Sequence, residues 1–438
     1  MSESVSAKAN PAKDVLVEDD PLYEELYDVR REAQTMGNLV EQDMTPAITA
    51  LRRRAPVHKG YLRELLGLPS HFRHVMAVGR PGFSALSFEA CNIAFRDPKH
   101  FSSKIAHHPS EKNEETLGIL EMDGPKHHTY RRTIQAKFNP AEAFNWWRPR
   151  WINEIVTRLI DRLKDRERAE LNLDFCARIP VHTISTSIGM SGDDSLKFRD
   201  AYMKSSGIGR TTPELQRAAG ATVEHMLLSL IAERRREPRD DLASYLIDAQ
   251  LRQSDGSVRP LQDREIMTHL RLVMIAGGGT SWRQLGITLW ALLTHPEQYA
   301  EVKADRSLLD AAIEEALRWN PTAPVFSRLV ESDTELCGVP VPAGAVLELC
   351  LGSANRDESR WQNPDAYDIH RPLLTNVAFG LGTHRCLGMS VARSEIAVGI
   401  NALLDAFPNM RLDPTAPAPV LTGGLEQRGV SGLRVLLR

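Results

Sequence analysis

The chain is most distinctive at residues 379–388, where it reads Phe379-Gly380-Leu381-Gly382-Thr383-His384-Arg385-Cys386-Leu387-Gly388. Its glycines allow the backbone to turn tightly around a single cysteine. A helix is expected to begin near Gly388, so backbone N–H groups of its first turn would stabilise a thiolate at Cys386. His384 and Arg385 can both carry positive charge, which suits an anionic ligand beside the cysteine.

The residue types in this loop leave several kinds of site open, besides a structural cysteine buried in a glycine turn. A cysteine nucleophile needs a histidine base, but His384 points off the same loop. A zinc site needs three or four ligands, and no paired Cys or His motif accompanies Cys386. A haem with one axial thiolate needs one cysteine, glycines for clearance over the porphyrin and cations for the propionates. The haem interpretation fits best.

Composition excludes several other classes of protein. The 438 residues include 54 Lys and Arg against 57 Asp and Glu, and 42% of them are hydrophobic. Such a chain is neither disordered nor basic enough for a nucleic-acid binder, so no nucleic acid is expected as a partner. Its five scattered cysteines suit a reducing compartment.

The sequence shows no targeting signal and no run of 18 apolar residues, so we expect a cytoplasmic protein without a membrane span. Residues 1–20 are small, polar and charged, which is typical of a flexible N-terminal arm. Residues 21–438 are expected to form the catalytic domain.

The hydrophobic pattern predicts a mainly α protein with a small β portion. The longest predicted helix covers 263–293, a hairpin is predicted at 74–87, and a long functional loop at 97–118. Glycines 277, 278 and 279 lie in the middle of the long helix, where each costs about 1 kcal/mol relative to alanine. They indicate either the close approach of a flat ligand or a helix break or tight helix packing.

The run at 379–388 resembles the signature Phe-Gly-x-Gly-x-His-x-Cys-x-Gly of the cytochrome P450 superfamily. Further stretches resemble family motifs in the same order, namely Asp123-Gly124-Pro125-Lys126-His127 with Arg131-Arg132, Ala276-Gly277-Gly278-Gly279-Thr280, Glu315-Ala316-Leu317-Arg318, Ala354-Asn355-Arg356-Asp357 and Asn363-Pro364. The resemblance covers residues 25–438. It implies a single large fold with a long central helix over a haem held by a cysteine loop, as in soluble bacterial members.

The resemblance also assigns roles to individual residues. Cys386 would be the axial thiolate ligand of the iron in haem b, and Arg371 would join the helix pair of Glu315 and Arg318, which share a face at i and i+3. The remaining haem-binding residues would be Phe379, Gly380, Gly388, Ala276, Gly277 and, at the propionates, His127, Arg131, Arg328 and His384. A mostly apolar wall would bind substrate through Leu272, Ile275, Val325, Phe326 and Val430, with lids at 97–118 and 206–212.

The chain departs from the family pattern at one position. The resembled motif places an acid directly before Thr280 to relay protons during oxygen activation, but this chain has Gly279 there. Thr280 and Gly279 are therefore the catalytic positions of interest. Loss of a positioned acid is expected to slow the reaction or leak peroxide, unless water or another side chain substitutes for it. On this reasoning Gly279→Asp would raise the product formed per NADH.

The resemblance implies a monooxygenase that inserts one oxygen atom from O2 into a hydrophobic small organic molecule. Electrons would come from NAD(P)H through a ferredoxin reductase and a ferredoxin, which could dock on a basic patch of Lys126, Arg132, Lys137 and Arg393. A monomer is expected. The alternatives are a peroxide-driven peroxygenase or other haem-thiolate enzyme, and a haem-binding sensor without turnover.

Overall fold

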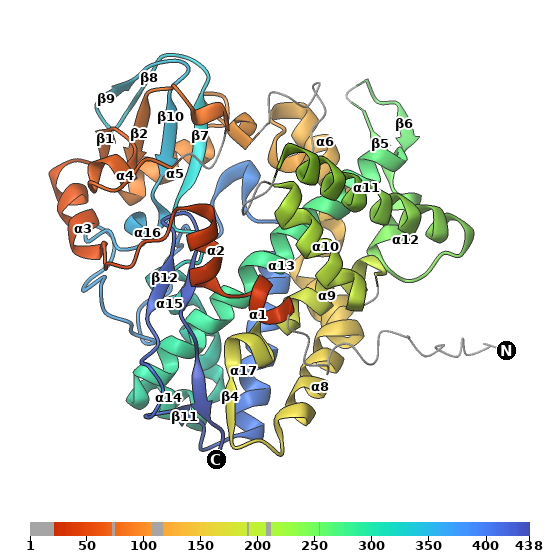
Figure 1. The fold of residues 1–438 in the computed structure, drawn as a ribbon. Coiled ribbons are helices and arrows are strands. Elements are labelled where there is room, and N and C mark those ends of the chain that lie inside the picture. Colours follow the sequence, from red (N-terminus) through yellow and green to blue (C-terminus); the bar gives the residue numbers. More distant parts are fainter. Residues whose placement is uncertain (1–21, 72–74, 107–116, 191, 207–211, 254) are drawn as a thin grey trace.

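The central element of the fold is helix α13, Asp263–Thr294, which confirms the long helix predicted from the sequence. The computed structural model describes residues 22–438 except 72–74, 107–116, 191, 207–211 and 254. A capping box formed by Gln262 and Glu265 begins α13, and most of its residues are buried on all sides. The helix crosses the middle of the molecule (Figure 1), so its neighbours are drawn from many parts of the chain.

Helices make up most of the described chain. Their bounds are α1 Leu22–Leu26, α2 Val29–Met36, α3 Thr45–Arg54, α4 Leu62–Leu65, α5 Phe88–Arg96, α6 Gly124–Gln135, α7 Pro140–Glu142, α8 Asn153–Leu163, α9 Arg178–Ile188, α10 Gly192–Ser205, α11 Pro213–Arg236, α12 Leu242–Asp248, α14 Pro296–Ala304, α15 Leu309–Trp319, α16 Leu351–Ala354 and α17 Met389–Ala406. The main apolar core lies where α9, α11, α15 and α17 pack on α13, and α8 packs in turn on α9 and α17.

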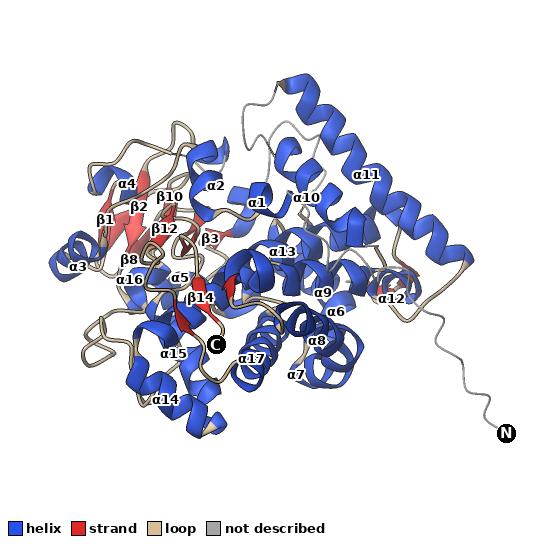
Figure 2. Cartoon of the chain, turned by 60° about the horizontal axis from the view of Figure 1, so that its bottom comes forward, coloured by secondary structure: helices blue, strands red, loops and turns tan. Residues whose placement is uncertain are grey.

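The strands form a smaller part of the molecule, and the largest group of them lies on one side (Figure 2), opposite the hairpin of β5 and β6 (Figure 1). Their bounds are β1 Val57–Lys59, β2 Gly82–Ala85, β3 Phe101–Ser102, β4 Arg168–Glu170, β5 Gln250–Arg252, β6 Val258–Pro260, β7 Phe326–Val330, β8 Thr334–Leu336, β9 Val339–Val341, β10 Val346–Leu349, β11 Arg411–Leu412, β12 Leu421–Gly423, β13 Arg428–Val430 and β14 Arg434–Leu436. The largest sheet has the order β1-β2-β10-β7-β3, and a second apolar cluster lies against it. The architecture is the mainly α fold with a small β portion that the sequence predicts.

The hairpin predicted at 74–87 is wrong. Within the described residues Val75–Ala77 form a 3-10 turn, and only β2 is a strand. β2 pairs antiparallel with β1 and parallel with β10, so neither of its partners lies within residues 74–87. Local alternation of apolar residues identified a strand but could not identify its partners.

Two other predictions concern segments that the structure describes in part. Residues 97–118 include β3 and a 3-10 turn at Ser103–Ala106, while 107–116 lie outside the described residues. The predicted arm, residues 1–20, and most of the predicted lid at 206–212 also lie outside them. Among the helices that the structure does describe, none is both long and apolar enough to cross a membrane.

Candidate functional site

The cysteine loop folds as its glycines predict. The N–H of Cys386 donates to the carbonyl oxygen of Phe379 at 2.8 Å, which closes the loop before α17 begins. Gly380 and Gly382 have φ of 63° and 69°, in the left-handed region. A Cβ at Gly382 would lie 2.2 Å from the carbonyl oxygen of Phe95, so only glycine fits there.

The sulfur of Cys386 lies in surroundings that suit a thiolate. The surrounding protein removes water from the Cys386 thiol, which raises its pKa. This rise is opposed by the N–H groups of Gly388 and Met389 and by the cations of Arg131 and Arg393. Those N–H groups and cations favour the charged form. The Cys386 side chain is exposed, whereas three of the other cysteines are buried, namely Cys91, Cys176 and Cys350. It is therefore the cysteine best placed to bind a metal ion.

Two histidines stack beside the loop. The rings of His127, on α6, and His384 lie 4.1 Å apart, and Nε2 of His384 lies 3.1 Å from a carboxylate oxygen of Asp123. Burial acts to raise the pKa of Asp123, but hydrogen bonds from His384 and Ser102 hold it below its ordinary value. Burial, together with His384 and Arg131, lowers the pKa of His127 to about 3. Asp123 thus fixes His384 in place.

Two arginines complete a cationic cluster. The guanidinium of Arg131 donates to the carbonyl oxygen of Arg385, next to the cysteine, at 2.6 Å. Arg328, on β7, is 7% exposed, and burial lowers its pKa to about 10. Among the residues that the structure describes, no carboxylate forms an ion pair with Arg328, and its one hydrogen bond goes to the carbonyl of Ser327. A buried cation without an anionic partner is costly unless a ligand supplies the charge.

These observations fit a haem group. Both ring nitrogens of His127 are buried without a hydrogen-bond partner among the described residues, and Arg328 lacks an anion. Propionate carboxylates would satisfy both groups, together with Arg131 and His384. The exposed, N–H-stabilised sulfur of Cys386 would bind the haem iron. His127, Arg131, Arg328 and His384 thus cluster around one loop.

Glu315, Arg318 and Arg371 form a buried ion cluster. Two carboxylate–guanidinium contacts of 2.7 Å join Glu315 and Arg318, and Arg371 Nε lies 3.0 Å from Glu315. Arg318 also donates to the carbonyls of Asn355, Pro364 and Ala366. The Asn355 side chain accepts from the N–H of Val377, so this cluster connects to the segment that leads into the cysteine loop.

The middle of α13 gives each residue of its glycine motif a different environment. Ala276 is exposed although its helix is mostly buried, and the hydroxyl of Thr280 donates to the Ala276 carbonyl at 2.9 Å. A Cβ at Gly277 would lie 2.7 Å from the Ile184 side chain on α9. The structure therefore gives close helix packing as the reason for Gly277, while Ala276 offers the exposed surface that a flat ligand needs.

The expected substrate residues do not all lie in one environment. Leu272, Ile275 and Phe326 are half-buried, which leaves part of each side chain accessible. Val325 is buried in a small apolar cluster with Val40, Met44, Leu51, Leu62, Leu86, Cys350 and Leu425. Val430 is buried on β13, and its carbonyl accepts from Asn172. Leu272, Ile275 and Phe326 thus remain the stronger candidates for substrate contact.

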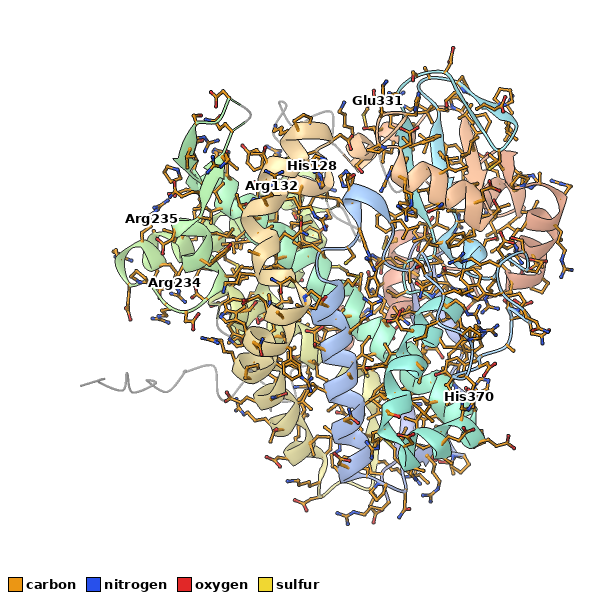
Figure 3. All side chains as sticks on the ribbon, turned by 180° about the vertical axis from the view of Figure 1, so that it is seen from behind. His128, Arg132, Arg234, Arg235, Glu331 and His370 are labelled. Atoms are coloured by element: carbon orange, nitrogen blue, oxygen red, sulfur yellow. The ribbon has the colours of Figure 1, made fainter. Side chains whose placement is uncertain are left out.

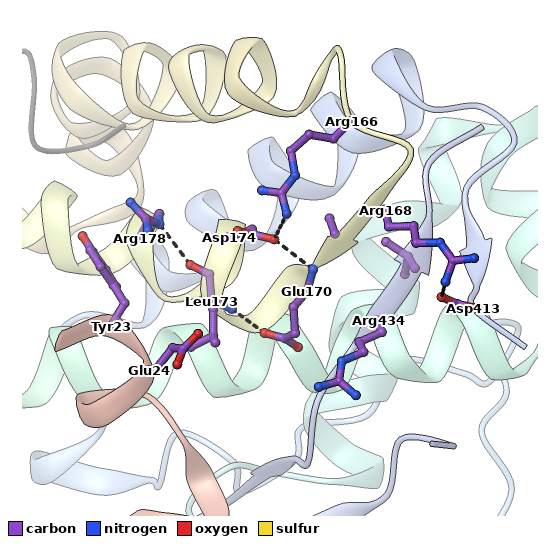
Figure 4. A pocket seen from close by; sticks show the side chains of 12 residues that line it. Tyr23, Glu24, Arg166, Arg168, Glu170, Leu173, Asp174, Arg178, Asp413 and Arg434 are labelled. Carbon is purple, nitrogen blue, oxygen red and sulfur yellow. Dashed lines mark hydrogen bonds and ion pairs between the residues drawn. The ribbon is translucent and has the colours of Figure 1, made fainter. Parts of the chain in front are cut away.

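A pocket of about 570 Å³ lies elsewhere, beside β4 and β14 (Figure 4). Its charged lining is self-neutralising, with Arg166 paired to Asp174 at 2.9 Å and Arg168 to Asp413 at 2.6 Å. No residue of α13 or of the cysteine loop lines it. This pocket is therefore separate from the site around Cys386.

Sequence reasoning missed a second cluster, which lies beside Gly279. Arg283, on α13, donates through its side chain to the Gly279 carbonyl oxygen and also to Glu32 on α2. Arg199, on α10, lies 3.6 Å from the same Glu32 carboxylate. Arg283 follows Thr280 closely in the sequence, but no periodic pattern connects Arg283 to the N-terminal helix α2.

Comparisons with known proteins agree with this geometry. The family model described as Cytochrome P450 matches residues 208–423. Cytochrome P450 105C1 from a Streptomyces species is 32% identical over 376 residues, which cover 85% of this chain and 90% of that protein. Vitamin D3 dihydroxylase from Streptomyces griseolus is 32% identical over 384 residues, which cover 85% of this chain and 92% of that protein.

Solved structures match over nearly the whole chain. A post-tailoring hydroxylase of himastatin biosynthesis, HmtN, is 26% identical with a TM-score of 0.72, covering 93% of this chain and 99% of its own. A myxobacterial cytochrome P450 in complex with myristic acid is 26% identical with a TM-score of 0.77, covering 94% and 99%. With its cysteine loop, its cation cluster and relatives of this extent, the chain belongs to the cytochrome P450 family and is a haem b monooxygenase with an axial cysteine thiolate.

Proposed function

We propose that this monooxygenase inserts one oxygen atom from O2 into a hydrophobic small organic molecule, with electrons from NAD(P)H delivered through a ferredoxin reductase and a ferredoxin. The observation that carries the substrate class is the apolar, half-buried character of Leu272, Ile275 and Phe326. Relatives named as a vitamin D3 dihydroxylase and a himastatin hydroxylase support a small organic substrate.

The residues of the site divide the work between binding and proton handling. When bound, haem supplies the oxygen-activating chemistry, with Cys386 as the ligand that donates electron density to the iron. Arg131, Arg328 and His384 would hold the propionates, and Asp123 orients His384 through the 3.1 Å contact. Thr280 keeps its hydroxyl on the central helix, where its oxygen can accept a hydrogen bond while its proton is donated to Ala276.

The exposed face of α6 is the proposed docking surface for ferredoxin. Arg132 is exposed there (Figure 3), and no described acid forms an ion pair with it. Lys126, on the same helix, is exposed as well, and so is Arg385 beside the cysteine. The other two residues of the expected patch are paired with acids, Lys137 with Glu142 at 3.2 Å and Arg393 with Glu314. Arg132 is thus the strongest docking residue of the expected patch.

A screen of hydrophobic compounds for a spin-state shift, followed by turnover of the compounds that bind, tests the proposal. Myristic acid is a suitable first compound, because a similar solved structure binds it. Product with NADH, reductase and ferredoxin is the expected result. Product with peroxide alone would identify a peroxygenase, and binding without product by either route would favour a sensor.

The docking surface has its own test. Arg132→Glu should raise the ferredoxin concentration needed for half-maximal turnover, and the effect should shrink as salt screens the charges. Arg411→Glu, at an exposed residue of β11 away from α6 (Figure 1), makes the same change of charge outside the proposed surface and serves as the control. The cytoplasmic location, the monomeric state and the single catalytic domain over 21–438 stay predictions.

A further inference from the structure

Two arginines converge on the glycine that stands where the family motif has an acid. A Cβ at Gly279 would lie 3.8 Å from Nη1 of Arg199 and 3.9 Å from Nη1 of Arg283, which is ordinary contact distance. The side chain of an aspartate there would therefore reach both guanidiniums without displacing backbone. Arg283 already donates to the Gly279 carbonyl oxygen, the group that directly precedes Thr280.

The carboxylate that these arginines bind comes from the N-terminal helix. Oε2 of Glu32 accepts from Nη2 of Arg283 and lies 3.6 Å from Nη2 of Arg199. The side chains of Arg283, Glu32 and Arg199 are 3%, 11% and 13% exposed, so the cluster is largely removed from water. Within the described chain, Glu32 is the one acid that forms an ion pair with either arginine.

Several contacts fix Glu32 in this position. Asp28 caps α2, and its side chain accepts from the N–H of Arg31. Val29 packs so closely on β13 that a Cβ at Gly429 would lie 2.8 Å from its methyl group. The Leu26 carbonyl accepts two bonds from Arg199, at 3.0 and 3.2 Å. The carboxylate thus sits on a packed element whose own hydrogen bonds set its orientation.

Aromatic rings close the cluster on another side. The Arg199 guanidinium lies 4.3 Å from the ring centre of Tyr27, and Tyr27 meets Trp282 edge-on at 5.7 Å. Burial lowers the pKa of Arg283, whereas the Glu32 charge acts to raise it. In surroundings this apolar, Glu32 strongly favours the charged guanidinium that binds the Gly279 carbonyl.

We propose that Glu32, held by Arg283 and Arg199, replaces the acid missing at position 279 and is the proton-exchanging positioning residue for Thr280. The proposal rests on the monooxygenase activity assigned above and deepens it. In its acid form Glu32 releases a proton through intervening water toward the Thr280 hydroxyl, which passes on its own proton. The Glu32 carboxylate then takes another proton from solvent, so protons balance and no electron moves at these residues.

The arginines cannot play this part themselves, because a guanidinium stays protonated under physiological conditions. Their role is to hold the Glu32 carboxylate and the Gly279 carbonyl at one place. The chain therefore places its acid on α2 and keeps Gly279 free of a side chain.

The experiment moves the carboxylate between the two positions in the haem-loaded protein. Glu32→Gln should lower the product formed per NADH by about tenfold and raise peroxide release. This loss is smaller than the roughly 10²–10⁴-fold effect of a positioned acid, because water replaces part of the proton delivery. Gly279→Asp in the Glu32→Gln protein should restore the yield. Gly279→Asp alone should give no gain, in contrast to the expectation from the sequence, because Glu32 already supplies the acid. Myristic acid is the first test compound, replaced by any compound with a larger spin-state shift.

A matched control separates this role from general surface charge. Glu25→Gln removes an acid that is 57% exposed and pairs with Arg31 at 3.6 Å in the same N-terminal segment. That variant should keep the parent yield. A Glu32→Gln protein with the parent yield would overturn the proposal, and so would a clear gain from Gly279→Asp alone.

A second readout needs no turnover. If Glu32 holds Arg283 on the Gly279 carbonyl, Glu32→Gln should speed backbone hydrogen exchange in the peptide 276–283, and Glu25→Gln should not. Unchanged exchange would count against the proposal even if no compound is oxidised. If Glu32→Gln loads haem poorly, the comparison rests on Glu32→Gln/Gly279→Asp, whose failure to recover the parent exchange rate would also overturn it.

Discussion

Replacing Glu315 by alanine should remove the anion on which its buried cluster with Arg318 and Arg371 depends. Glu315 and Arg318 are 5% and 2% exposed, and two 2.7 Å contacts join them. The substitution leaves the Arg318 guanidinium buried with carbonyl acceptors but no counter-charge, which costs about 3–5 kcal/mol. It also removes the acceptors of the Asp368 N–H and of Arg371, both at 3.0 Å.

The part-buried Asp368 N–H adds about 1 kcal/mol when it loses its acceptor. The total, roughly 4–6 kcal/mol, is comparable to the whole stability of a typical folded chain, about 5–15 kcal/mol. Because Arg318 also binds the Asn355 carbonyl, and Asn355 binds the segment before the cysteine loop, the loss should reach the haem site. We therefore expect poor haem incorporation rather than a loaded enzyme with altered specificity.

The assay measures haem per chain and the urea dependence of unfolding, followed by circular dichroism. Glu314→Ala is the matched control, because Glu314 precedes Glu315 on α15 and pairs with Arg393 at 3.0 Å but is 26% exposed. Its loss should cost only about 0.2–1 kcal/mol. A fully loaded Glu315→Ala protein with a free energy of unfolding within about 1 kcal/mol of the parent would refute this reasoning.

Three further outcomes are expected. Cys386→Ser should abolish the red-shifted absorbance of the reduced carbon-monoxide complex, since a hydroxyl replaces the thiolate, and a retained spectrum would exclude Cys386 as the ligand. Deletion of residues 1–20 should leave haem content and the unfolding temperature nearly unchanged, and a clear loss of stability would show that this segment docks on the body. Burial raises the pKa of Glu395 to about 8, from an ordinary value of 4.5, so the folded chain keeps a proton that the unfolded chain releases. Stability should therefore fall as pH rises between these values, and urea unfolding of Glu395→Gln should show a flatter dependence; an equally steep one would contradict the assignment.

The sequence predicted those parts of the site that are local or that carry a strong motif. Glycines around Cys386 required a tight loop, and the structure shows Gly380 and Gly382 in the left-handed region. The spacing of Glu315 and Arg318 placed them on one face of a helix, where they pair. The position of Arg371 in that cluster came from family resemblance, because no periodic pattern connects it to α15.

Contacts between distant segments could not be predicted. Arg283 and Glu32 are 251 positions apart, and nothing in either neighbourhood of the sequence indicates the other. The same limit explains the failed hairpin, whose strand β2 pairs with β10. Gly277 is a third example of this limit. The periodicity of the long helix could not distinguish the approach of a ligand from helix packing, because the Ile184 side chain that packs on Gly277 belongs to α9.

The docking of α2 on β12 and β13 has a consequence for the order in which the molecule can assemble during synthesis. Figure 1 shows this early helix beside strands from the end of the chain, and Val29 contacts both Gly423 and Gly429. A ribosome releases α2 long before it makes these strands, so the helix lacks its strand partners until almost all of the chain has emerged. Contacts of such long sequence separation form slowly. A nascent chain stopped before Leu421 should therefore leave α2 accessible to protease, although α13 is complete.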